Sequence, residues 1–143
     1  MTLKTGSEIL AQTEPFYDRF AEALKIVGAG NGTGAIALAA ALHSFADKMH
    51  VLSWIKSSAT AFGFGVLFFA AAYFCLMYAY VHLENYATDL DRTVAANADM
   101  SPSATNARDA SIKTMRWAAW LTLASTACFF GGLGIALVAL IRF

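Results

Sequence analysis

The chain has 143 residues, of which 58% are hydrophobic and 14% are charged, and ten basic residues balance ten acidic ones. Soluble domains usually carry about 45–50% apolar and about 25% charged residues, so this composition is typical of a membrane protein. The zero net charge excludes a globally basic surface for nucleic acid, and any anion-binding site must therefore be local.

Residues 1–27 predict an amphipathic helix on the cytoplasmic side of a membrane. Apolar residues recur at spacings of three and four from Ile9 to Val27, while acidic side chains such as Glu14 occupy another face. We expect Pro15 to interrupt this pattern or to restart the helix as its first residue, with Glu14 as the cap. Because acidic residues precede any apolar run, the segment is not expected to be a cleaved signal peptide.

The next segment, "GAGNGTGAIALAAALHSFA", has two interpretations. Gly30, Gly32 and Ala35 fit the G-x-G-x-x-A turn of a dinucleotide-binding fold, but no second strand–helix unit follows them. As a helix, the uncharged stretch 26–46 is long enough to cross a membrane, and small residues four apart would let another backbone approach closely. A membrane helix is favoured, and a surface-lying or re-entrant segment stays an alternative.

Asn31 is the main strongly polar residue of this first span. An amide within a bilayer needs a protein partner or water. Three positions therefore stay open for Asn31: the lining of a pore, an interface between subunits, and the interfacial entry of the helix.

Two long uncharged runs predict further membrane helices. Residues 57–83 and 117–141 contain 27 and 25 residues, and each run exceeds the roughly 20 residues that cross a bilayer. Phe62, Phe69 and Tyr73 lie close to one face of the first run. They would face lipid, pack inside the protein, or form an aromatic constriction that closes a pore by dewetting.

Residues 84–116 form a polar connector between these runs. Ser101 and Pro102 predict a helix cap and the first helical residue, so we expect the last helix to begin well before the membrane and to contribute to a small cytoplasmic collar. Phosphate contacts and stacking on Trp117 would suit an anionic ligand here, while stop-transfer charges explain the same basic residues without a ligand. The candidates for ligand binding are Arg92, Arg108, Lys113 and Arg116.

The sequence indicates neither an enzyme nor a cofactor or metal site. No cytoplasmic carboxylate pair stands with a His or Cys, and no phosphate-binding loop or zinc spacing occurs. The positions of His43, His50 and His82 favour interfacial histidines over haem ligands. Cys75 and Cys128 favour packing over a disulfide or a metal pair.

The basic residues favour three spans with a cytoplasmic N-terminus. That arrangement places seven Lys and Arg inside and three outside, whereas two spans divide them six to four. The sequence thus predicts an all-α membrane protein, with the amphipathic helix over 1–27, a transmembrane domain over 28–143, and the last two helices extended into the cytoplasm. Small-residue faces on all three predicted spans favour a homo-oligomer over packing within one chain.

The stretch "NGTGAIALAAALHSF", after an amphipathic helix and before two strong spans, resembles a group of small bacterial membrane proteins with an Asn-Gly-x-x-Ala-x-Ala-Leu helix entry. Thr33 and Gly34 replace the more usual Gly-Ala pair. Within that group the chain is most similar to the membrane effector of Hailong-type anti-phage systems. The residues that carry the resemblance are Asn31, Gly32, Ala35, Ala37 and Leu38.

The resemblance implies a tetrameric ion channel in the bacterial inner membrane. Single-stranded DNA oligomers made by a partner nucleotidyltransferase would hold it closed, and their removal on phage infection would open it and depolarise the membrane. The resemblance assigns no ligand residue, so the basic candidates above rest on charge and position. Two other functions stay open, a non-conducting accessory membrane subunit and a holin-like lysis protein.

Overall fold

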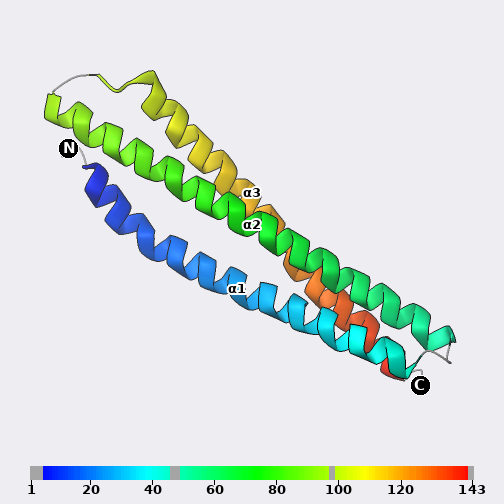
Figure 1. Ribbon diagram of the computed structural model, residues 1–143. Coiled ribbons are helices and arrows are strands. Elements are labelled where there is room, and N and C mark those ends of the chain that lie inside the picture. The colour runs from blue at the N-terminus through cyan, green and yellow to red at the C-terminus, as the bar shows by residue number, and fades with distance from the viewer. Residues whose placement is uncertain (1–4, 46–48, 97–98, 142–143) are drawn as a thin grey trace. The chain divides into compact units, whose positions relative to one another are not determined.

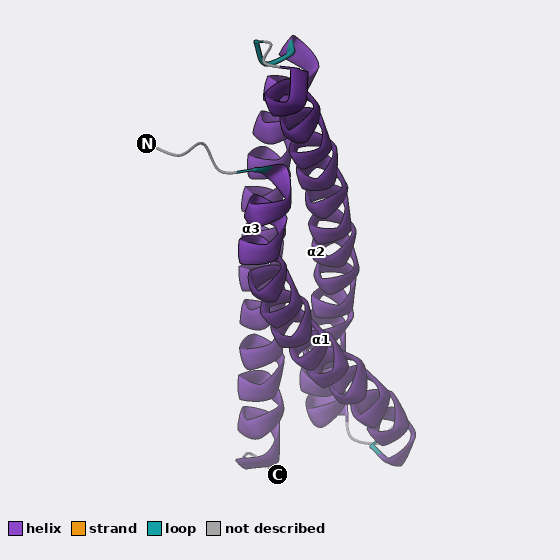
Figure 2. Cartoon of the chain, turned by 90° about the vertical axis from the view of Figure 1, so that its left-hand side faces the viewer, coloured by secondary structure: helices purple, strands orange, loops and turns teal. Residues whose placement is uncertain are grey.

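The computed structural model describes residues 5–45, 49–96 and 99–141, and these residues form three α-helices (Figure 1). α1 covers Gly6–Ser44, α2 covers Met49–Ala96 and α3 covers Pro102–Ile141. Figure 2 shows helices and no strand in the part of the chain that is described. The predicted all-α class is therefore confirmed.

Each helix contains a segment that is long and apolar enough to span a membrane: Gly6–Leu42, Val51–Ala96 and Pro102–Ile141. With 48 residues, α2 is about 72 Å long at 1.5 Å per residue. With 40 residues, α3 is about 60 Å long. Both lengths exceed the roughly 30 Å thickness of a hydrocarbon core. A helix of this length that crosses the membrane continues well beyond it.

The separate N-terminal amphipathic helix predicted over residues 1–27 is not present. α1 instead runs without a break from Gly6 to Ser44, and Pro15 lies inside it. Proline removes one backbone donor and crowds the carbonyl of the preceding turn, which bends or weakens a helix without always ending it. The prediction that Pro15 restarts the helix is therefore wrong, and the amphipathic and apolar segments belong to one element.

α1 begins at a capping box encoded by the sequence "TGSE". The Glu8 N–H donates to Thr5 Oγ1 at 3.3 Å, and the Thr5 N–H donates to Glu8 Oε2 at 3.0 Å. The Gly6 N–H donates to Asp91 Oδ1, near the end of α2, at 2.7 Å. A Cβ on Gly6 would lie 2.0 Å from the Ala87 carbonyl oxygen, so this approach requires glycine. These bonds satisfy first-turn donors and explain why the helix begins here.

The predicted start of α3 is confirmed. Pro102 is its first residue, and the Ala104 N–H donates to Ser101 Oγ at 3.2 Å. Serine at the cap accepts a bond from a donor that has no carbonyl within the helix, and proline at the first position lacks the donor that would be unpaired there. The cap is local in sequence, which is why it could be predicted.

The helices contribute to two compact units. Unit 1 comprises Met1–Glu22 and Tyr73–Ala119, and unit 2 comprises Ala23–Ala72 and Trp120–Phe143. Each unit contains a segment of all three helices. Unit 1 contains every basic candidate for ligand binding, while unit 2 contains Asn31 and most of the predicted aromatic stripe.

Candidate functional site

A buried amide joins the three helices in unit 2. The side chain of Asn31, on α1, is fully buried. Its Nδ2 donates to the Val27 carbonyl oxygen, the Ser125 carbonyl oxygen and Ser125 Oγ, at 3.1 Å in each case. Ser125 Oγ, on α3, in turn donates to the carbonyl oxygen of Gly65 on α2 at 2.7 Å. Within one chain, Asn31 therefore contacts protein instead of water.

The other end of this amide is packed against a glycine. Asn31 Oδ1 is buried without a conventional hydrogen-bond partner, and a Cβ on Gly65 would lie 2.1 Å from it. The Cα–H bond of Gly65 thus faces the amide group, because the same Cβ would also lie 2.3 Å from Asn31 Cγ. Any larger residue at position 65 would displace the amide.

Glycines in unit 2 accept aromatic rings from neighbouring helices. Phe62 is 4% exposed, and its ring would lie 2.6 Å from a Cβ on Gly34 and 2.9 Å from a Cβ on Gly132. Phe69 packs in the same way on Gly28, where an added Cβ would lie 2.5 Å from its ring. The sequence predicts close approach of another backbone at such glycines, whereas in these three cases a ring fills the space that the missing side chain leaves.

Only some of the small residues on the predicted helix faces contact another helix of the same chain. Ser58 is fully buried and its Oγ donates to the Gly132 carbonyl oxygen at 2.6 Å, a further link between α2 and α3. Other glycines face open space, because a Cβ on them would meet no atom within 4 Å. These glycines are Gly32, Gly63, Gly131 and Gly134.

The remaining residues singled out in the sequence have ordinary surroundings. Tyr73, at the edge of unit 1, is half-buried. Cys75 and Cys128 are free, half-buried thiols. His82 packs edge-on against a tyrosine with ring centroids 4.4 Å apart, and the side chains of His43 and His50 lie outside the described part of the chain. A pore or interface role for Asn31, Phe62, Phe69 and Tyr73 stays a prediction.

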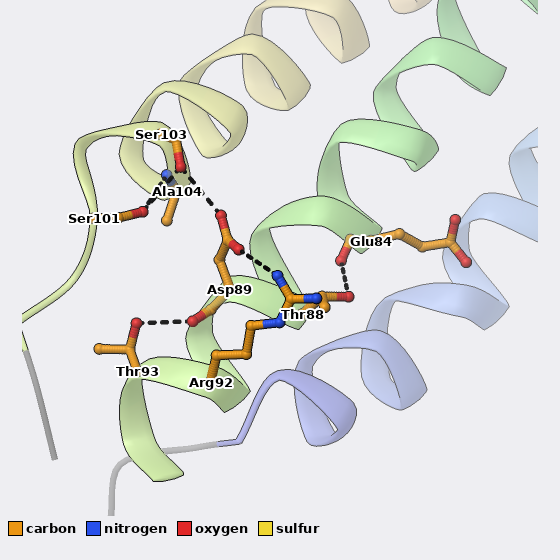
Figure 3. A network of polar contacts seen from close by, with 8 residues as sticks. All are labelled: Glu84, Thr88, Asp89, Arg92, Thr93, Ser101, Ser103 and Ala104. Carbon is orange, nitrogen blue, oxygen red and sulfur yellow. Dashed lines mark hydrogen bonds and ion pairs between the residues drawn. The ribbon is translucent and has the colours of Figure 1, made fainter. Parts of the chain in front are cut away.

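A polar groove of about 360 Å³ lies in unit 1, between the end of α2 and the start of α3. Asp89 accepts a hydrogen bond from Ser103 Oγ at 3.3 Å and pairs with Arg92 Nη1 at 3.6 Å (Figure 3). Ser103 Oγ is also 2.9 Å from Ser101 Oγ, within the helix cap. Because the carboxylate of Asp89 offsets the charge of Arg92, this groove is poorly suited to an anion.

An apolar groove of about 460 Å³ also lies in unit 1. Phe16 and Phe20 of α1 stack with ring centroids 6.3 Å apart, and Tyr17 packs edge-on against Tyr80 of α2 at 5.3 Å. Arg116 of α3 is exposed and is the one charged residue among the described residues of the lining. The main apolar lining residues are Phe16, Tyr17, Phe20, Leu83, Ile112 and Met115.

The four basic candidates do not line one common groove. Arg92 belongs to the polar groove and Arg116 to the apolar groove. Arg108 and Lys113 are exposed on α3 and line neither groove. The sequence predicts a common cluster from proximity along the chain, but successive residues of a helix project about 100° apart and therefore face different surroundings.

Comparisons with family models, with curated proteins and with solved structures give no match for this chain. The class that can be stated therefore rests on the fold, an all-α protein with three long apolar helices that could span a membrane. These candidate membrane-spanning helices suggest a membrane location.

Two features were missed at the sequence level. The capping box from Thr5 to Glu8 follows the S/T-x-x-E pattern and was visible in the sequence. The pairing of Asn31 with Ser125 had no such signal, because 94 residues separate the two and serine is unremarkable in a membrane helix.

Proposed function

We propose that the protein is a bacterial inner-membrane protein that assembles with copies of itself, as a tetramer, into an ion-conducting pore. A nucleic-acid ligand on the cytoplasmic side keeps the pore closed, and loss of that ligand on phage infection opens it. The support from the structure is the apolar outer surface of all three helices: Ile36, Phe74 and Leu140 are 73%, 75% and 72% exposed. Such a surface must be covered by lipid or by other subunits.

The ligand part of the proposal rests on two exposed cations of α3. Among the described residues, neither Arg108 nor Lys113 has an ion-pair partner, so their charges are available to phosphate groups. Arg92 is less suited, because Asp89 lies 3.6 Å from it. Arg116 has no ion-pair partner in the described part of the chain, but it borders an almost wholly apolar surface. The two charges of Arg108 and Lys113 are the ones to test first.

The purified protein should conduct ions in a planar bilayer, and a short oligodeoxynucleotide on the cytoplasmic face should suppress the current. The double variant Arg108→Gln/Lys113→Gln should need a higher oligonucleotide concentration for the same suppression, and the dependence on salt should weaken by roughly one unit of slope per lost phosphate contact. Arg19→Gln/Lys25→Gln removes the same charge from exposed positions of α1 and is the matched control.

Three outcomes would contradict the proposal. Absence of current both with and without oligonucleotide would exclude a pore function. A small species that co-purifies with a larger membrane protein would indicate the non-conducting accessory subunit. Killing on expression that no oligonucleotide suppresses would indicate the holin-like lysis protein.

A further inference from the structure

We propose that the apolar groove of unit 1 binds an anionic phospholipid, with an acyl chain against the aromatic rings and the phosphate at Arg116. This inference rests on a membrane location and is independent of the pore. Three observations carry it: the chemistry of the lining, the unpaired charge at its edge, and the position of the groove along the helices.

The lining suits a hydrocarbon chain better than a nucleobase. Phe16, Tyr17 and Phe20 provide ring faces, and two of the three hydroxyl groups of the lining, those of Thr13 and Ser111, already donate their hydrogens to backbone carbonyls. Ser111 Oγ donates to the Ala79 carbonyl oxygen at 2.9 Å, and Thr13 Oγ1 donates to the carbonyl oxygen of the fourth residue before it at 2.8 Å. Beside the Arg116 guanidinium, the lining therefore offers a base edge little more than the Tyr17 hydroxyl, while most of its surface is apolar.

The charge of Arg116 is complementary to a phosphate. In the described part of the chain, no carboxylate pairs with Arg116, although it borders a surface that excludes water from one side. A guanidinium presents two parallel N–H groups that match two phosphate oxygens. Its aliphatic stem can lie along the apolar groove while the charged end stays at the surface. An anionic head group would therefore neutralise the one charge of the groove.

The groove lies where two apolar runs meet the polar part of the chain. The uncharged run 57–83 ends at Leu83, and the run 117–141 begins directly after Arg116; both residues line the groove. Trp117 and Trp120 are 57% and 68% exposed, and exposed tryptophan is typical of the membrane–water interface. This is the level at which phospholipid phosphates lie, so the source of the anion is a lipid.

The test is native mass spectrometry of the full chain released from detergent, with phosphatidylglycerol and phosphatidylcholine of the same acyl chains as probes. The wild-type chain should retain phosphatidylglycerol preferentially, and Arg116→Gln should reduce its retention about fivefold. Arg19→Gln removes the same charge from an exposed position of α1, outside the lining, and should leave retention unchanged. Ala119→Leu should fill the groove and lower the retention of both lipids.

Equal loss of phosphatidylglycerol in Arg116→Gln and Arg19→Gln would overturn the proposal, because it would indicate attraction by net charge alone. Displacement of the lipid by a short oligodeoxynucleotide would also overturn it and would assign the groove to nucleic acid. Circular dichroism of each variant checks that the helices are intact. Neither result depends on conductance, so failure here and failure of the pore are separable.

Discussion

Asn31 is a polar side chain that stabilises an otherwise apolar helix contact. Burial of an amide without partners costs about 1–3 kcal/mol, and more in an environment without water. Here Nδ2 has three acceptors within 3.1 Å, and the hydroxyl of Ser125 carries the network on to α2. The same groups would be costly in any other alignment of the helices. We therefore expect the network to fix which turns of α1, α2 and α3 face one another in unit 2.

Gly65→Ala is the sharpest test of this network. The new Cβ would lie 2.1 Å from Asn31 Oδ1, so the amide must move and lose bonds to Ser125, which should destabilise the protein by about 1–3 kcal/mol. Gly63→Ala is the control, because a Cβ there meets no atom within 4 Å and alanine favours the helix by about 0.5–1 kcal/mol. Thermal unfolding in detergent, followed by circular dichroism, measures both. Equal effects would show that the amide does not depend on position 65.

Polarity alone identified Asn31 as unusual, but its environment could not be predicted. Its partners come from other helices, and which residues face it depends on how the helices rotate and slide during packing. The predicted glycine faces show the same limit. Their spacing is evident in the sequence, while the choice of a ring in place of a backbone is set by Phe62 and Phe69 on another helix.

At the scale of one element, α1 contains Pro15 at an internal position, where proline disfavours a helix. Pro15→Ala restores an N–H that can donate to the carbonyl of the preceding turn, so it should stabilise α1, by up to about 3 kcal/mol. Hydrogen exchange around residues 11–15 should slow, and the thermal midpoint should rise. If Pro15 were instead the first residue of a helix, its substitution would have little effect, because the donor at that position is unpaired in any case.

The beginning of α1 depends on a residue far along the chain. Asp91→Ala removes the acceptor of the Gly6 N–H and should destabilise the first turn by about 1 kcal/mol, as the loss of other helix caps does. Faster hydrogen exchange at the first turn of α1 would report this. Asp109→Ala, which removes an equal charge from an exposed position of α3, is the control and should leave that exchange unchanged.

Helix positions and boundaries were predicted well where residues within the helix or next to it fix them. The runs 57–83 and 117–141 fall inside α2 and α3, and the cap at Ser101 lies where it was expected. The continuity of α1 was not predicted, because Pro15 and the glycines from 28 to 34 each disfavour a helix locally. Contacts with α2, such as the rings of Phe69 on Gly28 and of Phe62 on Gly34, stabilise the helical conformation there.

For the whole molecule, the predicted topology of three spans with a cytoplasmic N-terminus would place the two ends of α2 on opposite sides of the membrane. Single cysteines at Met49 and Ser103, both exposed, can be introduced after replacement of Cys75 and Cys128 by alanine. A membrane-impermeant thiol reagent added to intact cells should label position 49 and leave position 103 unlabelled until the cells are opened. Labelling of both positions from outside would contradict three spans.

The candidate ligand site was the least predictable part of the molecule. Arg92, Arg108, Lys113 and Arg116 are close along the sequence, yet one pairs with Asp89, one borders aromatic rings and two face solvent. The surroundings of Arg116 depend on α1, which contributes Phe16 and Phe20 from nearly a hundred residues earlier. Charge density along a sequence therefore indicated where basic residues occur but not which of them share a surface.

The contact between Asn31 Oδ1 and Gly65 also constrains how this protein can change during evolution. A side chain at position 65 is excluded only while the amide occupies that space, and the Ser125 hydroxyl is needed mainly because the amide and the Gly65 carbonyl must be bridged. Positions 31, 65 and 125 should therefore be inherited as a set. In related sequences, loss of the asparagine should be accompanied by larger residues at 65 and by alanine or other apolar residues at 125.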